Sequence, residues 1–228
     1  MLPLIRHVVR RVRGYMLNHD QYLHYYAAKT DQRAAIDPQE AVGGLWDEIG
    51  GLQFEFLLKE GLKPQNTLLD IGCGSLRAGR HIIRHLEPSH YTGLDMSEGV
   101  LAAARSLVTT EGLSDKAPLL LRTDGALDFS FVDRRYDYLL AQSVFTHLWP
   151  ASIEQCLSNV HKAMHDGSLF FFTFFEAPRL SNPADTLFEQ PFSFYADLAQ
   201  KHDLMLTRHP DYDARHPRGQ KMLSVRNG

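Results

Sequence analysis

The sequence predicts an α/β fold in which a mostly parallel sheet carries helices on both faces. From Leu52 onward, short apolar segments typical of buried strands alternate with segments whose apolar residues recur at helical spacing. Repeated β-α units of this length imply parallel strands connected by helices. The segment SLFFFTFF (168–175) is almost continuously apolar, which is typical of a central parallel strand covered on both faces.

The first half of the sheet is predicted from three apolar segments. A strand at 67–72 is followed by a helix whose apolar face includes Leu76 and which ends before Pro88. Further strands follow at 91–95 and 118–122. The order of these segments indicates two consecutive β-α-β units.

The second half continues the same alternation. A fourth strand is predicted at 136–145, and Pro150 opens a helix whose inner face extends to Met164. Asp166-Gly167 is expected to form the turn into the apolar strand. The remaining elements are a helix at 192–202 and short strands at 204–210 and 221–225.

Residues 1–50 are predicted to form an N-terminal helical cap, and residues 51–228 the main domain. The first 16 residues show a basic amphipathic pattern. We favour a helix docked on its own domain or on a partner subunit, which leaves a homodimer open, over a helix for a membrane surface or an acidic ligand. The tyrosine-rich segment at 21–32 would complete the cap.

The composition narrows the classes of partner and compartment. The chain has 228 residues, is 44% hydrophobic and carries a formal net charge of -3, which argues against nucleic acid as its main partner. Its two cysteines show no disulfide or metal spacing, so we expect a reducing, cytoplasmic setting. We expect neither an integral membrane segment nor a signal peptide, because the apolar runs are too short.

A glycine-rich turn follows the first predicted strand. Gly72 and Gly74 lie on either side of Cys73, and Asp70 comes just before them. Glycines let backbone N–H groups approach a ligand, and ligands of such sheets bind outside the carboxyl ends of the strands. We therefore predict a cofactor-binding turn, with a turn that serves packing alone as the alternative. Its spacing differs from the G-x-G-x-x-G pattern of dinucleotide folds.

Polar residues also follow the other strands. Asp95 ends the second strand, where a carboxylate can accept hydrogen bonds from both hydroxyls of a ribose. Asp124 follows the third strand and could accept from an adenine amino group, while Gly125 leaves room for the ring. Gln142 and Ser143 end the fourth strand beside the glycine turn. Together these residues indicate a site for a nucleoside cofactor.

At this point the chain resembles the class I S-adenosylmethionine-dependent methyltransferases. The segments LLDIGCGS, YTGLDMS, RTDGALDF and YDYLLAQSVFTHL resemble successive motifs of that family. The resemblance runs from about Gly51 to the C-terminus. It implies a Rossmann-like, seven-stranded sheet in the order 3-2-1-4-5-7-6 with the last strand antiparallel.

The resemblance also implies roles for single residues, with S-adenosyl-L-methionine as the cofactor. Gly72 with Gly74 would hold its methionine end, Asp95 its ribose and Asp124 its adenine amino group. Met96 would pack on the adenine.

The chain departs from the family after the second glycine of the turn. Many members carry a third glycine where this chain has SLRAG (75–79), so that Leu76 and Arg77 occupy the predicted start of the helix. Arg77 would either reach the cofactor carboxylate or brace the N-terminal cap.

We expect a small-molecule acceptor that is methylated on oxygen. The Asn/Asp-Pro-Pro-aromatic motif of many enzymes that methylate amide or base-ring nitrogens is replaced by AQSVFTHLWP (141–150). His147 is the candidate general base, with a structural role as the alternative, and His216 is the next candidate. His161 and His165 are spaced as i and i+4, but we predict no metal site.

Aromatic side chains and two polar loops are expected near the acceptor. The loops are the segments at 176–191 and 211–220. The aromatic residues expected there are Phe145, Trp149, Phe192, Tyr22, Tyr25 and Trp46.

Three other functions remain open from the sequence. A protein or peptide methyltransferase would need an open groove, and a non-catalytic partner protein could keep the fold and the cofactor residues. A nicotinamide oxidoreductase is disfavoured by the glycine spacing.

Overall fold

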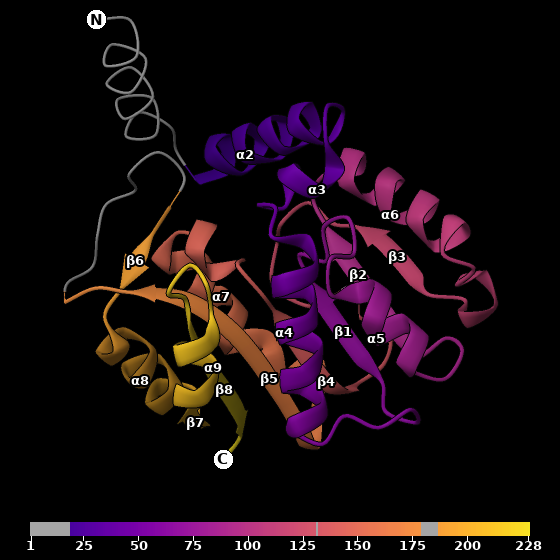
Figure 1. Ribbon diagram of the computed structural model, residues 1–228. Coiled ribbons are helices and arrows are strands. Elements are labelled where there is room, and N and C mark those ends of the chain that lie inside the picture. The colour runs from indigo at the N-terminus through magenta and orange to yellow at the C-terminus, as the bar shows by residue number, and fades with distance from the viewer. Residues whose placement is uncertain (1–18, 131, 179–186) are drawn as a thin grey trace, which may run out of the picture.

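A sheet in the order β3-β2-β1-β4-β5-β8-β7 forms the centre of the computed structural model, which describes residues 19–130, 132–178 and 187–228 (Figure 1). A short additional strand, β6, pairs with β5 outside this path. The strands are β1 (Leu68–Ile71), β2 (Tyr91–Asp95), β3 (Leu119–Arg122), β4 (Tyr136–Ala141), β5 (Met164–Glu176), β6 (Glu189–Gln190), β7 (Leu204–Arg208) and β8 (Lys221–Asn227).

The predicted sheet order and strand directions are confirmed. Strands β1 to β5 pair in parallel, whereas β8 runs antiparallel to both β5 and β7. The numbers of the last two strands rise by one only because β6 is inserted before them. The carboxyl ends of β1, β2 and β4 therefore lie at one edge of the sheet.

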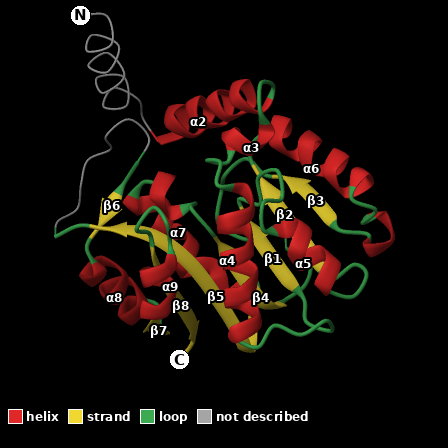
Figure 2. Cartoon of the chain, in the orientation of Figure 1, coloured by secondary structure: helices red, strands yellow, loops and turns green. Residues whose placement is uncertain are grey.

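Helices cover both faces of the sheet, as expected (Figure 2). Phe170 and Phe172 of β5 pack in one apolar cluster with α7 and α8, while Phe171 packs in the other with α4, α5 and α6. This alternation follows from the two-residue repeat of a strand. The helices are α4 (Trp46–Lys59), α5 (Gly79–His85), α6 (Glu98–Thr110), α7 (Pro150–Asn159), α8 (Phe192–Lys201) and α9 (Pro210–Arg215).

Within the described residues, α2 (His19–Ala34) and α3 (Pro38–Ala41) precede α4. Tyr22 and Leu23 of α2 are buried in the same apolar cluster as α7 and α8. At the other end of α2, Asp31 accepts hydrogen bonds from the Ser97 hydroxyl at 2.5 Å and from the Gly99 N–H at 2.9 Å, both at the start of α6. The predicted basic helix over the first 16 residues lies outside the described part of the chain.

Three local predictions were wrong. Helix α5 begins at Gly79 and not at Leu76, which has a left-handed backbone with φ of 71°. Met164 begins β5 and does not belong to the preceding helix. Asp166-Gly167 lies within β5, because the register shift between Tyr136 and Tyr138 of β4 accommodates extra residues of β5 as a bulge.

No helix within the described ranges is both long and apolar enough to cross a membrane.

We predict that Ser97→Ala lowers the free energy of unfolding by about 1–2 kcal/mol. The Ser97 hydroxyl accepts from the Val100 N–H at the start of α6 and donates to Asp31, so the substitution removes a helix cap and a link to α2. Urea unfolding followed by circular dichroism measures the change. Exposed Ser106→Ala, within the same helix, is the control. An equal effect of the two substitutions would contradict the role given to Ser97.

Candidate active site

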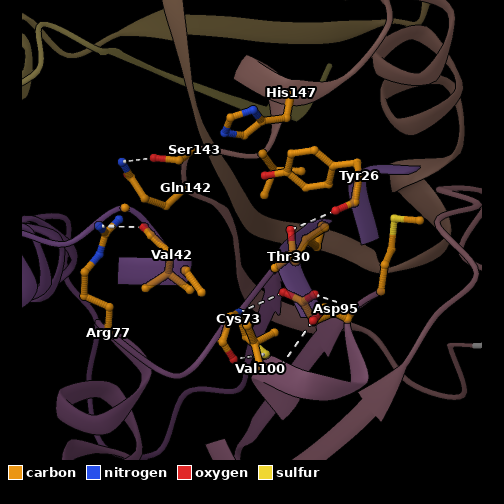
Figure 3. A pocket seen from close by; sticks show the side chains of 18 of the residues that line it. Tyr26, Thr30, Val42, Cys73, Arg77, Asp95, Val100, Gln142, Ser143 and His147 are labelled. Atoms are coloured by element: carbon orange, nitrogen blue, oxygen red, sulfur yellow. Dashed lines mark hydrogen bonds between the residues drawn. The ribbon is translucent and has the colours of Figure 1, made fainter. Parts of the chain in front are cut away.

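A cavity of about 630 Å³ opens at the carboxyl ends of β1, β2 and β4, where α2 and the turn after α3 cover it (Figure 3). Its volume lies within the range of small-molecule sites. In Figure 3, His147 and Tyr26 lie together on one side, Arg77 and Val42 lie across from them, and Asp95 lies below. The predicted residues that line it are Asp70, Gly72, Cys73, Gly74, Arg77, Asp95, Met96, Gly125, Gln142, Ser143 and His147.

The glycine turn is fixed by hydrogen bonds to the end of β2. The N–H groups of Gly72 and Cys73 donate to the Leu94 carbonyl at 2.7 and 2.9 Å, and the Gly74 N–H donates to the Asp95 carboxylate at 2.9 Å. Both glycines have positive φ values, 71° and 55°. A Cβ at Gly72 would lie 2.5 Å from Val144, so a larger residue would displace the wall of the cavity.

Asp95 presents a carboxylate to the cavity from the end of β2. Its two oxygens accept from the N–H groups of Gly74 and Ser97, each at 2.9 Å. Burial raises the pKa of this carboxyl, and the two backbone donors oppose that rise. Each oxygen keeps further acceptor capacity, so the group is suited to binding a ligand with two hydroxyls.

Asp70 is the second carboxyl group in the wall of the cavity. It accepts a hydrogen bond from the Tyr91 hydroxyl at 2.6 Å. Burial raises the pKa of Asp70 from its ordinary value of 3.8 to about 7, and the charge of Asp95 acts in the same direction. The Tyr91 hydrogen bond and the Arg77 charge oppose this rise. Asp70 is therefore only partly ionised near neutral pH.

Arg77 braces the cap, which was one of its two predicted roles. Its Nη1 donates to the carbonyls of Val42 and Gly44, at 3.1 and 3.0 Å, in the turn between α3 and α4. The same side chain lines the cavity, and its buried Nε has no hydrogen-bond partner among the described residues. Burial lowers the pKa of Arg77 to about 10, which leaves it charged at neutral pH and available to an anionic ligand.

Asp124 does not reach the cavity, in contrast to its predicted place beside an adenine. Its side chain is exposed and accepts from the Ala126 N–H at 2.9 Å. The carboxylate thus satisfies its own turn, as aspartates often do two residues ahead. Neighbouring Gly125 does line the cavity, and a Cβ there would lie 2.8 Å from the Met96 sulfur.

Gln142 and Ser143 continue the wall from the end of β4. The Gln142 amide donates to Gln220 at 3.1 Å and accepts from the Tyr212 hydroxyl at 2.8 Å. The Ser143 N–H donates to Thr173 at 2.7 Å, which holds the residue in a left-handed conformation with φ of 58°. The polar edges of both residues are therefore fixed by β5 and the β7–β8 connection.

His147 lies in the short helix Phe145–His147 and lines the cavity. Its imidazole packs against the Tyr26 ring with a centroid distance of 4.9 Å, and its backbone carbonyl accepts from the Tyr22 hydroxyl at 2.8 Å. The position allows the imidazole to approach a ligand within the cavity.

The other candidate histidines are not placed for catalysis. His216 is buried outside the cavity lining, and its Nδ1 accepts from the N–H groups of Arg218 and Gln220, both at 3.3 Å. Burial lowers the pKa of His216 to about 4, so it remains neutral and structural. His161 and His165 lie in different elements, and no cluster of potential metal ligands occurs within the described ranges.

Part of the chain is similar to known methyltransferases. Residues 69–170 match the family described as "Methyltransferase domain". The chain is 29% identical over 110 residues to a sterol 24-C-methyltransferase of Gibberella zeae, an alignment that covers 48% of this chain and 28% of that protein. The chain spans less than half of the length of the curated relatives it matches, namely 28%, 42% and 46%.

Two solved structures share the fold. A DhpI complex with SAH has a TM-score of 0.63 at 18% identity, covering 90% of this chain and 95% of that chain. Magnesium protoporphyrin IX methyltransferase from Synechocystis PCC 6803 has a TM-score of 0.60 at 14% identity, covering 79% and 81%. Residues 69–170 thus match a methyltransferase domain, and the chain shares its fold with these two structures.

The aromatic lining of the cavity differs from the prediction. None of the six expected aromatic residues lines the cavity, and Tyr22, Phe145 and Trp149 pack in or against the core. Tyr26 and Phe175 line it instead. The residues in the lining that the sequence did not indicate include Leu23, Lys29, Thr30, Arg33, Val42, Val144, Leu187, Arg218 and Gln220.

Part of this missing set belongs to the loops that were expected near the acceptor. Arg218 and Gln220 lie in the connection between β7 and β8, and Leu187 follows β5. Tyr26 and Thr30 lie four residues apart, on one face of α2. This helical spacing in the sequence could have indicated that both residues line the cavity.

We predict that Asp70→Asn changes the pH dependence of the stability of this protein. Because the pKa of Asp70 is raised in the folded state, the protonated group stabilises the fold at low pH, and this contribution is lost as the pH rises through about 7. Asparagine can still accept from Tyr91 and does not ionise. The variant should therefore gain about 2 kcal/mol relative to wild type between pH 5.5 and 8.5.

Urea unfolding at a series of pH values tests this expectation. Asp124→Asn, which alters an exposed carboxylate outside the cavity, is the control and should parallel wild type. Parallel curves for wild type and Asp70→Asn would show that Asp70 titrates alike in the folded and unfolded states.

Proposed function

We propose that the protein transfers a methyl group from S-adenosyl-L-methionine to a small molecule, at an oxygen atom. The observation that carries this proposal is the convergence of the glycine turn and the Asp95 carboxylate on one capped cavity. The donors and acceptors in its wall fit the cofactor. The wall contains two hydrogen-bonded carboxyl groups and a buried guanidinium whose Nε–H has no partner among the described residues. It also contains glycines at which a side chain would collide with its neighbours.

Five residues would hold the cofactor. Asp95 would accept from the two ribose hydroxyls, and the backbone at Gly72 and Gly74 would face the methionine end. Arg77 would bind the carboxylate, and Met96 would pack against the adenine. Asp124 is left out of this set, because its carboxylate is engaged with its own turn.

The bound cofactor supplies an electrophilic methyl group on a sulfonium sulfur. The chain must then hold the acceptor in line and exclude water. His147 would accept the proton of an acceptor hydroxyl, since a neutral imidazole is a suitable base near neutral pH. The other candidate base, His216, is buried outside the cavity lining.

The cover over the cavity favours a small acceptor over a protein. Tyr26 of α2 and Val42 after α3 both lie over the sheet edge, so an extended peptide would not find an open groove. Apolar side chains that include Leu148, Leu187 and Phe175 would suit a ring-bearing or apolar acceptor. The names of the similar sterol and magnesium protoporphyrin IX methyltransferases are consistent with such an acceptor.

We predict that the protein binds S-adenosylmethionine and S-adenosylhomocysteine but not NAD. Asp95→Asn keeps the size of the side chain and removes a charged acceptor, so it should weaken binding by roughly ten- to a hundredfold. Isothermal titration calorimetry measures both effects. Asp124→Asn, the control outside the cavity, should bind like wild type. NAD binding without response to either adenosyl ligand would refute the proposed activity.

We predict that His147→Gln lowers turnover by about 10²–10⁴-fold while cofactor affinity and melting temperature stay near wild type. The physical reason is the loss of the group that takes the acceptor proton. Mass spectrometry of candidate hydroxyl acceptors, incubated with the cofactor, provides the substrate and the rate. Exposed His161→Gln is the control. A stable and fully active His147→Gln would exclude this residue as the base.

A further inference from the structure

Helix α2 contacts His147 with two side chains, one turn apart. The Tyr22 hydroxyl donates to the His147 carbonyl at 2.8 Å, and the Tyr26 ring packs on the imidazole at a centroid distance of 4.9 Å and an interplanar angle of 36°. Residues spaced by four lie on the same face of a helix. One face of α2 therefore holds both the backbone and the side chain of His147.

The contact at the backbone is a fixed one. Tyr22 is only 1% exposed, and its ring packs edge-on against Phe188 at 5.7 Å and Trp149 at 6.2 Å. The donor is therefore placed by the core and does not depend on a ligand. The carbonyl that it binds ends a short helix, where carbonyl groups lack a partner within the helix.

The same short helix is held from a second direction. The Phe188 N–H, just before β6, donates to the Thr146 carbonyl at 2.8 Å. Two successive carbonyl groups thus have donors from distant segments, α2 and the segment after β5. Without the donor on α2, the carbonyl group of His147, the last residue of this helix, would lose its hydrogen bond to Tyr22.

The contact at the side chain lies in the cavity wall. Tyr26 and His147 both line the cavity, and the tilted rings restrict the directions in which the imidazole can turn (Figure 3). Tyr26 is in turn fixed within α2, where its carbonyl accepts from the Thr30 hydroxyl at 3.0 Å.

We propose that Tyr22 and Tyr26 are positioning residues for His147. Helix α2 would then complete the catalytic site as well as cover it. This inference rests on the methyl transfer proposed above. Loss of either contact should let His147 move from the acceptor, and a misplacement of about 1 Å can lower a rate by about a hundredfold. Cofactor affinity should change little, because the proposed cofactor-binding residues lie on β1, β2 and the turns that follow them.

Three variants separate the two contacts. Tyr22→Phe removes only the hydroxyl, Tyr26→Leu removes the ring, and Tyr26→Phe keeps the ring and removes its hydroxyl. Tyr25→Leu is the matched control, since Tyr25 lies on the same helix, outside the cavity lining, with Lys29 over its ring at 6.0 Å.

One measurement follows the position of His147 directly, and two others report binding and catalysis. Its imidazole NMR signals are assigned by their absence in His147→Gln. They report the ring current of Tyr26, and they can be measured whether or not the variant is active. Calorimetry with S-adenosylhomocysteine and the rate on the acceptor found by mass spectrometry separate binding from catalysis.

We expect Tyr26→Leu and Tyr22→Phe to shift the His147 signals and to lower kcat by about ten- to a hundredfold, with S-adenosylhomocysteine affinity unchanged. Tyr26→Phe keeps the ring and should therefore retain the wild-type His147 signals, whereas Tyr25→Leu should retain both the signals and the rate. Unchanged His147 signals in both Tyr22→Phe and Tyr26→Leu would overturn the proposal, as would a fall in rate that only parallels a lower melting temperature. Failure of the wild type to bind S-adenosylhomocysteine would instead refute the proposed function.

Discussion

The hydrogen bonding between the glycine turn and the end of β2 is the constraint on which the site depends. Two N–H groups of the turn donate to the Leu94 carbonyl, and the Gly74 N–H donates to the Asp95 carboxylate. These bonds fix the turn after β1 against the strand that carries the acid. Because Asp95 holds the turn with one oxygen and the Ser97 N–H with the other, a single carboxylate connects β1, β2 and the start of α6. The cavity is therefore built around a backbone that no ligand has to organise.

The same arrangement places several ionisable side chains in a buried environment of low dielectric. Asp70 and Asp95 lie in one wall, and burial raises the pKa of both carboxyl groups. Arg77 opposes the rise at Asp70 from the other side, while burial lowers its own pKa to about 10. Such unfavourable burial is stable only where the surrounding fold fixes the groups, and perturbed carboxyl groups of this kind cluster at functional sites. The electrostatics thus agree with the geometry in placing the site at this edge.

Much of the fold followed from the sequence, because strand and helix periods are local properties of the chain. The site was predictable where strand ends determine position, as for Gly72, Asp95 and Ser143, since parallel strands end at the same edge. A local pattern does not indicate which of several possible partners a polar side chain binds. Asp124 binds its own turn, and His216 is held by backbone N–H groups two and four residues ahead. The contributions of Val42 and Arg218 depend on contacts between distant segments, which no local pattern reports.

The cap connects the glycine turn with His147. Arg33, Arg77 and Arg218 come from α2, the glycine turn and the β7–β8 connection, and all three donate to carbonyl groups between residues 40 and 44. That turn has consecutive left-handed residues, Gly43 to Leu45, and brings Val42 so close to Gly74 that a Cβ there would lie 2.5 Å away. The three guanidinium groups thus donate hydrogen bonds to the backbone of this left-handed turn. Since α2 at its other end carries the tyrosines that contact His147, one short segment before the sheet closes the cofactor side and the acceptor side together. Its sequence is therefore constrained by packing over the glycine turn as much as by any contact with an acceptor.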